Sequence, residues 1–192
     1  MSKDQTRTDN SHFAEKLQLR LDNLPGGKEL TVLDCFAGQG LLWKEIRRLR
    51  SERLFNIVSI DKKPTDAGSI HLVGDNVKFL AAIDLRRFDV IDLDAYGIPY
   101  EQLDLVLRRP TKPGAVLYVT LCQWGMGSLP EAMLRDLGYS RAMLAKTKMI
   151  FMRHGRRKIF WWLGARGVRR VKYFAAPQVG QLSQTYLATI VP

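Results

Sequence analysis

The apolar residues of this chain fall into short runs that alternate with segments of helical periodicity. Short runs rich in Val, Ile and Leu are typical of buried strands, and apolar residues three or four apart are typical of helices. The pattern predicts strands at 30–35, 55–60, 70–73, 88–93 and 115–122, and helices at 40–51, 75–82, 99–108 and 129–137. Repeated strand, helix and strand units predict an α/β fold with a parallel sheet and helices on both faces.

The two ends of the chain extend this alternation. Residues 11–24 place leucines and a phenylalanine among charged residues, which predicts an amphipathic helix ahead of the first strand. β-Forming residues at 168–174 and 185–191 predict a closing antiparallel hairpin, and we expect residues 141–163 before it to be helical. The polar residues 1–10 are expected to be disordered, so that residues 11–192 form a single domain.

The formal net charge of +11 is concentrated near the C-terminal end. Residues 1–136 contain 19 basic and 19 acidic residues, whereas residues 137–192 contain eleven Lys and Arg and no Asp or Glu. Such a one-sided excess indicates a polyanionic partner, foremost a nucleic acid, although a solvated basic face would give the same composition. The basic residues lie in a segment that spans 141–172.

Cations and aromatic rings are interleaved in the middle of this basic segment. Cations there are suited to phosphate groups, and rings to base stacking or core packing. We expect either Trp161 or Trp162 to be buried, because exposing two neighbouring tryptophans to water would be energetically unfavourable. The residues that we predict to contact phosphate are Arg153, Arg156, Arg157 and Lys158.

A glycine turn follows the first predicted strand. Gly38 and Gly40 stand where the backbone must approach a ligand, and the next helix offers its positive N-terminus there. Asp61 ends the second strand, 23 residues after Gly38, where a carboxylate can bind two ribose hydroxyls. Trp43 occupies the place where a dinucleotide fingerprint needs a small residue, and no phosphate loop is present. A cofactor with one ribose and no pyrophosphate fits this pattern best.

The stretch from Val32 to Gly40, Val-Leu-Asp-Cys-Phe-Ala-Gly-Gln-Gly, resembles the first motif of class I S-adenosylmethionine-dependent methyltransferases. The resemblance implies a Rossmann-like sheet, mostly parallel with a C-terminal antiparallel hairpin, and S-adenosylmethionine as the cofactor. By that similarity, the methionine part would be held by Asp34, Phe36, Ala37, Gly38 and Gly40. Asp61 would bind the ribose, and Asp75 and Asn76 would flank the adenine. Asp75 also has the position of a helix N-cap, and both roles are compatible.

A second motif ends the predicted strand 88–93. It reads Asp-Leu-Asp-Ala-Tyr-Gly-Ile-Pro over residues 92–99 and resembles the Asp-Leu-Asp-Pro-Phe-Gly-Ser-Pro motif of tRNA guanine-N2 dimethyltransferases. Ala95 and Ile98 depart from that motif, and the resemblance covers about residues 30 to 125, without the family's large C-terminal domain. It implies methyl transfer to an exocyclic amine of a nucleic-acid base, with guanine N2 of RNA favoured.

Such a reaction requires an amine held in line with the methyl group and a carboxylate that accepts the amine hydrogens. We assign this task to Asp94, with Asp92 as a residue that orients it or contacts the cofactor. The two carboxylates lie at alternate positions of one strand and therefore face the same side, so that the pKa of one of them can be raised. Tyr96 would stack on the target base, and Trp124 would form the other wall of the pocket or part of the core.

Three other functions compete with this one. A small-molecule methyltransferase is one of them, but it would leave the basic segment near the C-terminal end unexplained. A DNA adenine-N6 or cytosine-N4 methyltransferase would end the same strand Asp/Asn-Pro-Pro-aromatic, and no proline directly follows Asp94. A basic nucleic-acid-binding module without catalysis would explain the departures at Ala95 and Ile98. The sequence shows no membrane span, signal peptide or metal-ligand spacing, and Cys35 and Cys122 are expected to be reduced, which favours a cytoplasmic location.

Overall fold

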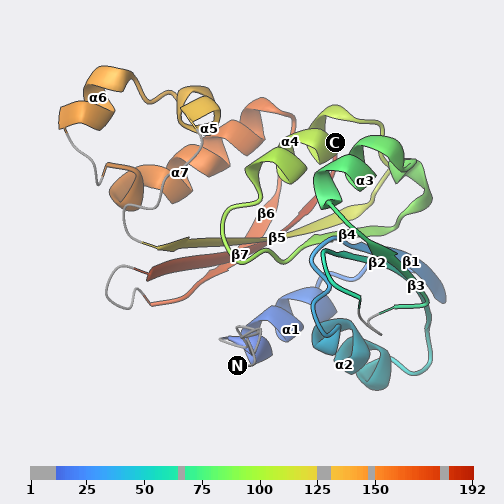
Figure 1. The fold of residues 1–192 in the computed structure, drawn as a ribbon. Helices are drawn as coiled ribbons and strands as arrows, with labels where there is room; N and C mark the ends of the chain where they lie inside the picture. Colours follow the sequence, from blue (N-terminus) through green and yellow to red (C-terminus); the bar gives the residue numbers. More distant parts are fainter. Residues whose placement is uncertain (1–11, 65–67, 125–130, 147–149, 178–181) are drawn as a thin grey trace, which may run out of the picture.

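The computed structural model describes residues 12–64, 68–124, 131–146, 150–177 and 182–192, and the predicted disordered residues 1–10 lie outside this part. One seven-stranded sheet runs through it, in the order β3-β2-β1-β4-β5-β7-β6 (Figure 1). The strands are β1 (Glu29–Asp34), β2 (Leu54–Asp61), β3 (Ile70–Val73), β4 (Val90–Leu93), β5 (Val116–Trp124), β6 (Val171–Ala175) and β7 (Leu182–Ile190). Each of the five predicted strands of the parallel part is present, and β4, an apolar run apart from Asp92, is buried along its whole length.

The helices of the described residues connect these strands. They are α1 (Phe13–Leu21), α2 (Leu41–Leu49), α3 (Asn76–Ala82), α4 (Tyr100–Arg108), α5 (Glu131–Asp136), α6 (Arg141–Lys146) and α7 (Ile150–Ala165), with a short 3₁₀ turn at Leu85–Arg87. The segment 141–163, expected to be helical, contains parts of two helices, α6 and α7.

The strands β1 to β5 are parallel, and β7 pairs antiparallel with both β5 and β6. This arrangement confirms the predicted sheet, mostly parallel with a closing antiparallel hairpin. The strand order reverses between β1 and β4, and Asp34 of β1 pairs directly with Asp92 of β4. In open parallel sheets, ligands bind beyond the carboxyl ends of the strands at such a reversal.

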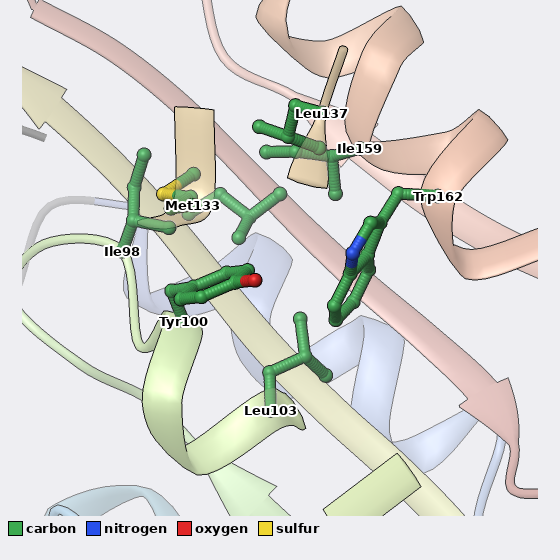
Figure 2. A pocket seen from close by; sticks show the side chains of 8 residues that line it. Ile98, Tyr100, Leu103, Met133, Leu137, Ile159 and Trp162 are labelled. Carbon is green, nitrogen blue, oxygen red and sulfur yellow. The ribbon is translucent and has the colours of Figure 1, made fainter. Parts of the chain in front are cut away.

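Helices cover both faces of the sheet, with α1 and α2 on one face and α3, α4 and α7 on the other (Figure 1). Trp43 and Ile46 of α2 form the core of the first face, where leucines of α1 join them. Apolar side chains of α4, α5 and α7 fill the second face. A residual cavity of only about 10 Å³ remains there, between Tyr100, Met133 and Trp162 among others (Figure 2). A void of this size holds at most one water molecule, so this layer is core and not a ligand site.

Candidate active site

The glycine turn after β1 is built as a cradle open to a ligand. Gly38 and Gly40 adopt φ angles of 51° and 65°, which side chains other than glycine rarely tolerate. The amide of Gly40 donates to the carbonyl of Ala37 at 2.7 Å, and α2 begins at the next residue, Leu41. A Cβ placed on Gly38 would meet no atom within 4 Å, so the backbone faces open space there. Leu41 also lines a cleft of about 480 Å³ between α1 and α2.

Asp61, predicted to bind a ribose, reaches the same turn from the end of β2. Its carboxylate accepts hydrogen bonds from the amide of Gly38 at 2.9 Å and from the amide of Lys63 at 3.1 Å. A carboxylate offers about four lone-pair positions, so two remain for the hydroxyls of a ribose. The structure therefore brings Asp61 and the glycine turn together as the sequence suggested.

Asp75 and Asn76 follow β3 and begin α3. The carboxylate of Asp75 accepts from the amides of Val77 and Lys78, so Asp75 is the N-cap of α3, and it remains exposed to solvent. The side-chain nitrogen of Asn76 donates to the backbone carbonyl of Cys35 at 3.1 Å, and its side-chain oxygen accepts from the side-chain nitrogen of Gln102 at 2.8 Å. Asn76 thereby ties the end of β1 to α4, and its predicted contact with an adenine stays a prediction.

Three carboxylates meet where β1 and β4 end, and we call Asp34, Asp92 and Asp94 the acidic centre. Asp34 and Asp92 are buried and lie on paired strands, whereas Asp94 is 19% exposed. Charges buried this deeply require partners of opposite sign. The cations come from α1, which covers this end of the sheet.

Arg20 of α1 is the main partner of Asp92. Its Nε and Nη2 donate to the two carboxylate oxygens at 2.8 and 2.7 Å, and both side chains are only 1% exposed. Trp43 donates its indole N–H to the same carboxylate at 3.0 Å. The guanidinium also lies 3.8 Å from Asp94 and stacks over the ring of Tyr118, 5.1 Å from the centroid. Asp92 is therefore fixed in one position by hydrogen bonds from α1 and α2.

Asp94, the predicted catalytic carboxylate, is held by two further contacts. Nζ of Lys16 lies 3.0 Å from Oδ1 and 3.1 Å from Oδ2, and the hydroxyl of Thr120 in β5 donates to Oδ1. Lys16 and Arg20 are one helical turn apart on α1, so both reach the acidic centre from one face of that helix. Asp94 is the most accessible carboxylate of the three.

The electrostatics differ between the members of the acidic centre. Burial raises the pKa of Asp34 well above its ordinary value, and the charges of Asp92 and Asp94 add to this effect. Burial also raises the pKa of Asp92, against the opposing effects of Arg20 and Trp43. Burial acts in the same direction on Asp94, but Arg20, Lys16 and Thr120 outweigh it and hold the pKa of that carboxyl below its ordinary value. Asp94 is thus ionised at neutral pH and partly open to solvent.

Tyr96 follows Asp94 after one residue, and its ring is 68% exposed at the end of β4. An exposed ring two residues after a partly open carboxylate can stack on a flat substrate. Trp124 ends β5, but its side chain lies outside the described part of the structure, as does the side chain of Arg153. Of the other predicted phosphate contacts, Arg156 and Arg157 are exposed on α7, and Lys158 is half-buried, with its ammonium over the ring of Tyr139.

Sequence reasoning did not find Lys16, Arg20 or Thr120. The sequence contains one indication for the two cations, since they stand beside the apolar stripe of the predicted first helix. A buried Asp-x-Asp motif needs a buried cation, and an i, i+4 pair of cations on an amphipathic helix is a suitable source. No sequence pattern identifies Thr120, whose position follows from the pairing of β4 with β5.

The described residues contain no group of three or more His, Cys, Asp or Glu arranged to hold a metal ion. None of the described helices has the length and apolarity that crossing a bilayer requires.

Solved structures share this fold. The chain superimposes on phosphoethanolamine N-methyltransferase 2 of Haemonchus contortus with a TM-score of 0.59 and 12% identity, over 94% of this chain and 53% of that one. For geranyl diphosphate C-methyltransferase of Streptomyces coelicolor, the TM-score is 0.55 at 10% identity, over 98% and 86% of the two chains. For precorrin-6y C5,15-methyltransferase of Geobacter metallireducens, it is 0.50 at 13% identity, over 99% and 92%. No family model and no curated protein matches the sequence.

The fold is therefore that of the class I S-adenosylmethionine-dependent methyltransferases, with the Rossmann-like sheet that the first motif implied. The first two of these structures contain S-adenosylhomocysteine, and their proteins act on phosphoethanolamine derivatives and on geranyl diphosphate. The chain spans about half the length of the Haemonchus protein. At identities this low, the likeness concerns the fold alone.

Proposed function

We propose that this protein is an S-adenosylmethionine-dependent methyltransferase that modifies an exocyclic amine of a nucleic-acid base, with guanine N2 of RNA as the favoured target. The observation that carries the proposal is the position of Asp94. Its carboxylate is ionised, fixed by Thr120 and partly open at the end of β4. It lies at the reversal point of a methyltransferase-like sheet, where β1 leads into the open glycine turn.

The residues of the cradle fit S-adenosylmethionine, which when bound supplies an electrophilic methyl group. The turn from Asp34 to Gly40 would hold the methionine part, because its backbone is open at Gly38. Asp61 would bind the ribose hydroxyls with its remaining lone pairs. Asp75 and Asn76 would flank the adenine at the start of α3.

Asp94 would act on the amine as a hydrogen-bond acceptor. An ionised carboxylate accepts an N–H of the amine, turns the nitrogen lone pair toward the methyl group and stabilises the positive charge that forms on nitrogen. Because the pKa of Asp94 is lowered, its carboxylate is a weak base, and the proton released by the methylated nitrogen passes on to solvent. The ammonium of Lys16 also binds the Asp94 carboxylate, so the amine must share this carboxylate with Lys16 or displace Lys16 from it.

The choice of a nucleic-acid base rests on three features. The motif at residues 92–99 resembles that of tRNA guanine-N2 dimethyltransferases, and Tyr96 offers an exposed ring at the position of the aromatic in that motif. The excess positive charge suits a polyanion. The methyltransferases of similar fold act on small molecules, which makes a small acceptor the main competing outcome.

The test is transfer of radiolabelled methyl groups to unmodified tRNA, ribosomal RNA and DNA in parallel, with phosphoethanolamine and geranyl diphosphate as small acceptors, followed by nucleoside analysis. We expect label in N2-methylguanosine. Asp94→Asn should lower the rate by about 10²–10⁴-fold and leave the affinity for S-adenosylhomocysteine within a few-fold. Asp22→Asn, at an exposed cap of α1, serves as the matched control and should have no effect. Label only in a small acceptor, or none despite cofactor binding, would overturn the proposal.

A further inference from the structure

The adjacent tryptophans of α7 have opposite environments. Trp162 is only 2% exposed and lies in the core, 5.6 Å from the ring of Tyr100 and under the guanidinium of Arg166, as Figure 2 shows for its position beside Tyr100. Trp161 is 63% exposed. Core packing explains Trp162 and leaves Trp161, the largest apolar side chain on α7 that faces water, without a role in the fold.

The surroundings of Trp161 are open and positively charged. Arg157 is exposed one turn before Trp161 on the same helix, so the two side chains lie on one face. Gly164, three residues after Trp161, is also exposed, and a Cβ placed there would meet no atom within 4 Å. We call Trp161 and Arg157 the α7 platform. An exposed flat ring with an exposed cation one turn before it is suited to a ligand that carries both a planar ring and a negative charge.

A second exposed ring on the neighbouring strand has the same composition. Tyr173 of the edge strand β6 is 50% exposed, its ring lies 5.0 Å from that of Phe160, and Arg156 lies over it at 5.6 Å. α7 and β6 therefore each present an aromatic ring beside an arginine. None of the ion pairs between described residues involves Arg156 or Arg157.

The position of α7 on the sheet shows where the α7 platform lies relative to the candidate active site. Gly167, just after the end of α7, contacts Pro192, and Ile190 near it pairs with Val116 at the start of β5. The C-terminal end of α7 thus lies at the amino edge of the parallel strands. α7 runs along the sheet (Figure 1), and Trp161 lies in its C-terminal half, four residues before its last residue, Ala165.

We propose that the α7 platform binds single-stranded nucleic acid, with an unpaired base stacked on Trp161 and the adjacent phosphate on Arg157. The positive charge of the basic segment favours a polyanion as the partner. The exposed indole favours a nucleic acid whose bases are unpaired, because only unpaired bases leave a flat ring free to stack on it. This inference rests on the proposed function for the class of partner only. It assigns a contact distant from the reacting amine, on the C-terminal half of α7.

The experiment measures anisotropy of a fluorescein-labelled single-stranded RNA of mixed sequence, and of its duplex, at several salt concentrations. Trp161→Leu should weaken binding of the single strand about tenfold, without changing the slope of log K against log salt. Trp161→Phe, which keeps a flat ring, should retain most of the affinity. Arg157→Ala should reduce that slope by about 0.7, the contribution of one phosphate contact on a single strand. Arg47→Ala, an exposed cation of α2 on the opposite face of the sheet, is the matched control.

Equal affinities of the Leu and Phe variants would overturn the proposal, because an apolar contact would then suffice. So would self-association of the wild type, seen in sedimentation, that Trp161→Leu abolishes, since the ring would then be a protein contact. The two proposals fail separately. If the protein methylates RNA but Trp161→Leu binds it as tightly as the wild type, only the α7 platform is disproved. If RNA binding depends on the Trp161 ring but no methyl transfer occurs, only the proposed enzymatic function is disproved.

Discussion

The acidic centre and the basic face of α7 hold charge in opposite ways. In the acidic centre, Arg20 and Asp92 are both 1% exposed and fix each other through two hydrogen bonds. On α7, Arg156 and Arg157 are exposed and face solvent without carboxylate partners among the described residues. Buried charges of this kind determine geometry, because each one left alone is very unfavourable, whereas exposed charges determine which partner approaches. Three variants test this contrast through the free energy of unfolding.

The largest effect is expected at Arg20. Arg20→Met keeps an apolar side chain in the same space but leaves Asp92 buried without its cation, which should lower the free energy of unfolding by about 3–5 kcal/mol. Urea denaturation measures the loss. Arg48→Met, which breaks the exposed pair with Glu45, is the control and should leave the unfolding midpoint in place. Similar losses in both variants would show that the buried pair does not organise the site.

An intermediate effect of opposite sign is expected at Asp34. The pKa of Asp34 is raised in the folded protein, so its contribution to stability is complete below the ordinary pKa of aspartate and is lost as pH rises through the folded value. Asp34→Asn removes this loss, and its free energy of unfolding should exceed that of the wild type by on the order of 1 kcal/mol at neutral pH. The difference should shrink at acidic pH. A destabilised variant at neutral pH would mean that the Asp34 carboxylate is stabilised by its surroundings.

The smallest effect on stability is expected on the basic face. Reversing both charges, Arg156→Glu with Arg157→Glu, should change the free energy of unfolding by no more than about 0.5 kcal/mol, because both side chains are exposed. The same variant should lose most of its affinity for RNA at about 50 mM salt and show a weaker dependence on salt than the wild type. Stable protein with unchanged affinity would exclude α7 as a nucleic-acid interface.

The same contrast explains what the sequence could predict. The parallel strands could be predicted because apolar residues dominate each of them. For β4, the predicted end was right, but the strand starts at Val90 and not at residue 88 as predicted. The glycine turn and Asp61 were found because their spacing along the chain reflects a local unit of strand, turn and helix. The charge excess near the C-terminal end needed only counting.

The contact between α1 and the acidic centre could not be predicted from apolar runs, local spacing or residue counts. Lys16 and Arg20 look like the solvent-facing charges of an amphipathic helix, and only the packing of α1 over β4 turns them inward. Likewise, nothing in the neighbouring tryptophans states which one is buried; the rotation of α7 on the sheet decides it. Contacts between distant segments carry the information that periodicity lacks.

The contact between Arg20 and Asp92 also bears on the order of folding. The two residues are 72 positions apart, and α1 has only nine residues, too few for a helix that is stable by itself in water. α1 can therefore become helical only after β4 has joined the sheet and offered its carboxylates, which places its docking late in folding. By the same reasoning it should be among the first elements to open, so that amide hydrogens of α1 exchange faster than those of β1 and β4. The helix whose cations neutralise the acidic centre would then also be the element whose local opening most readily exposes that centre to solvent.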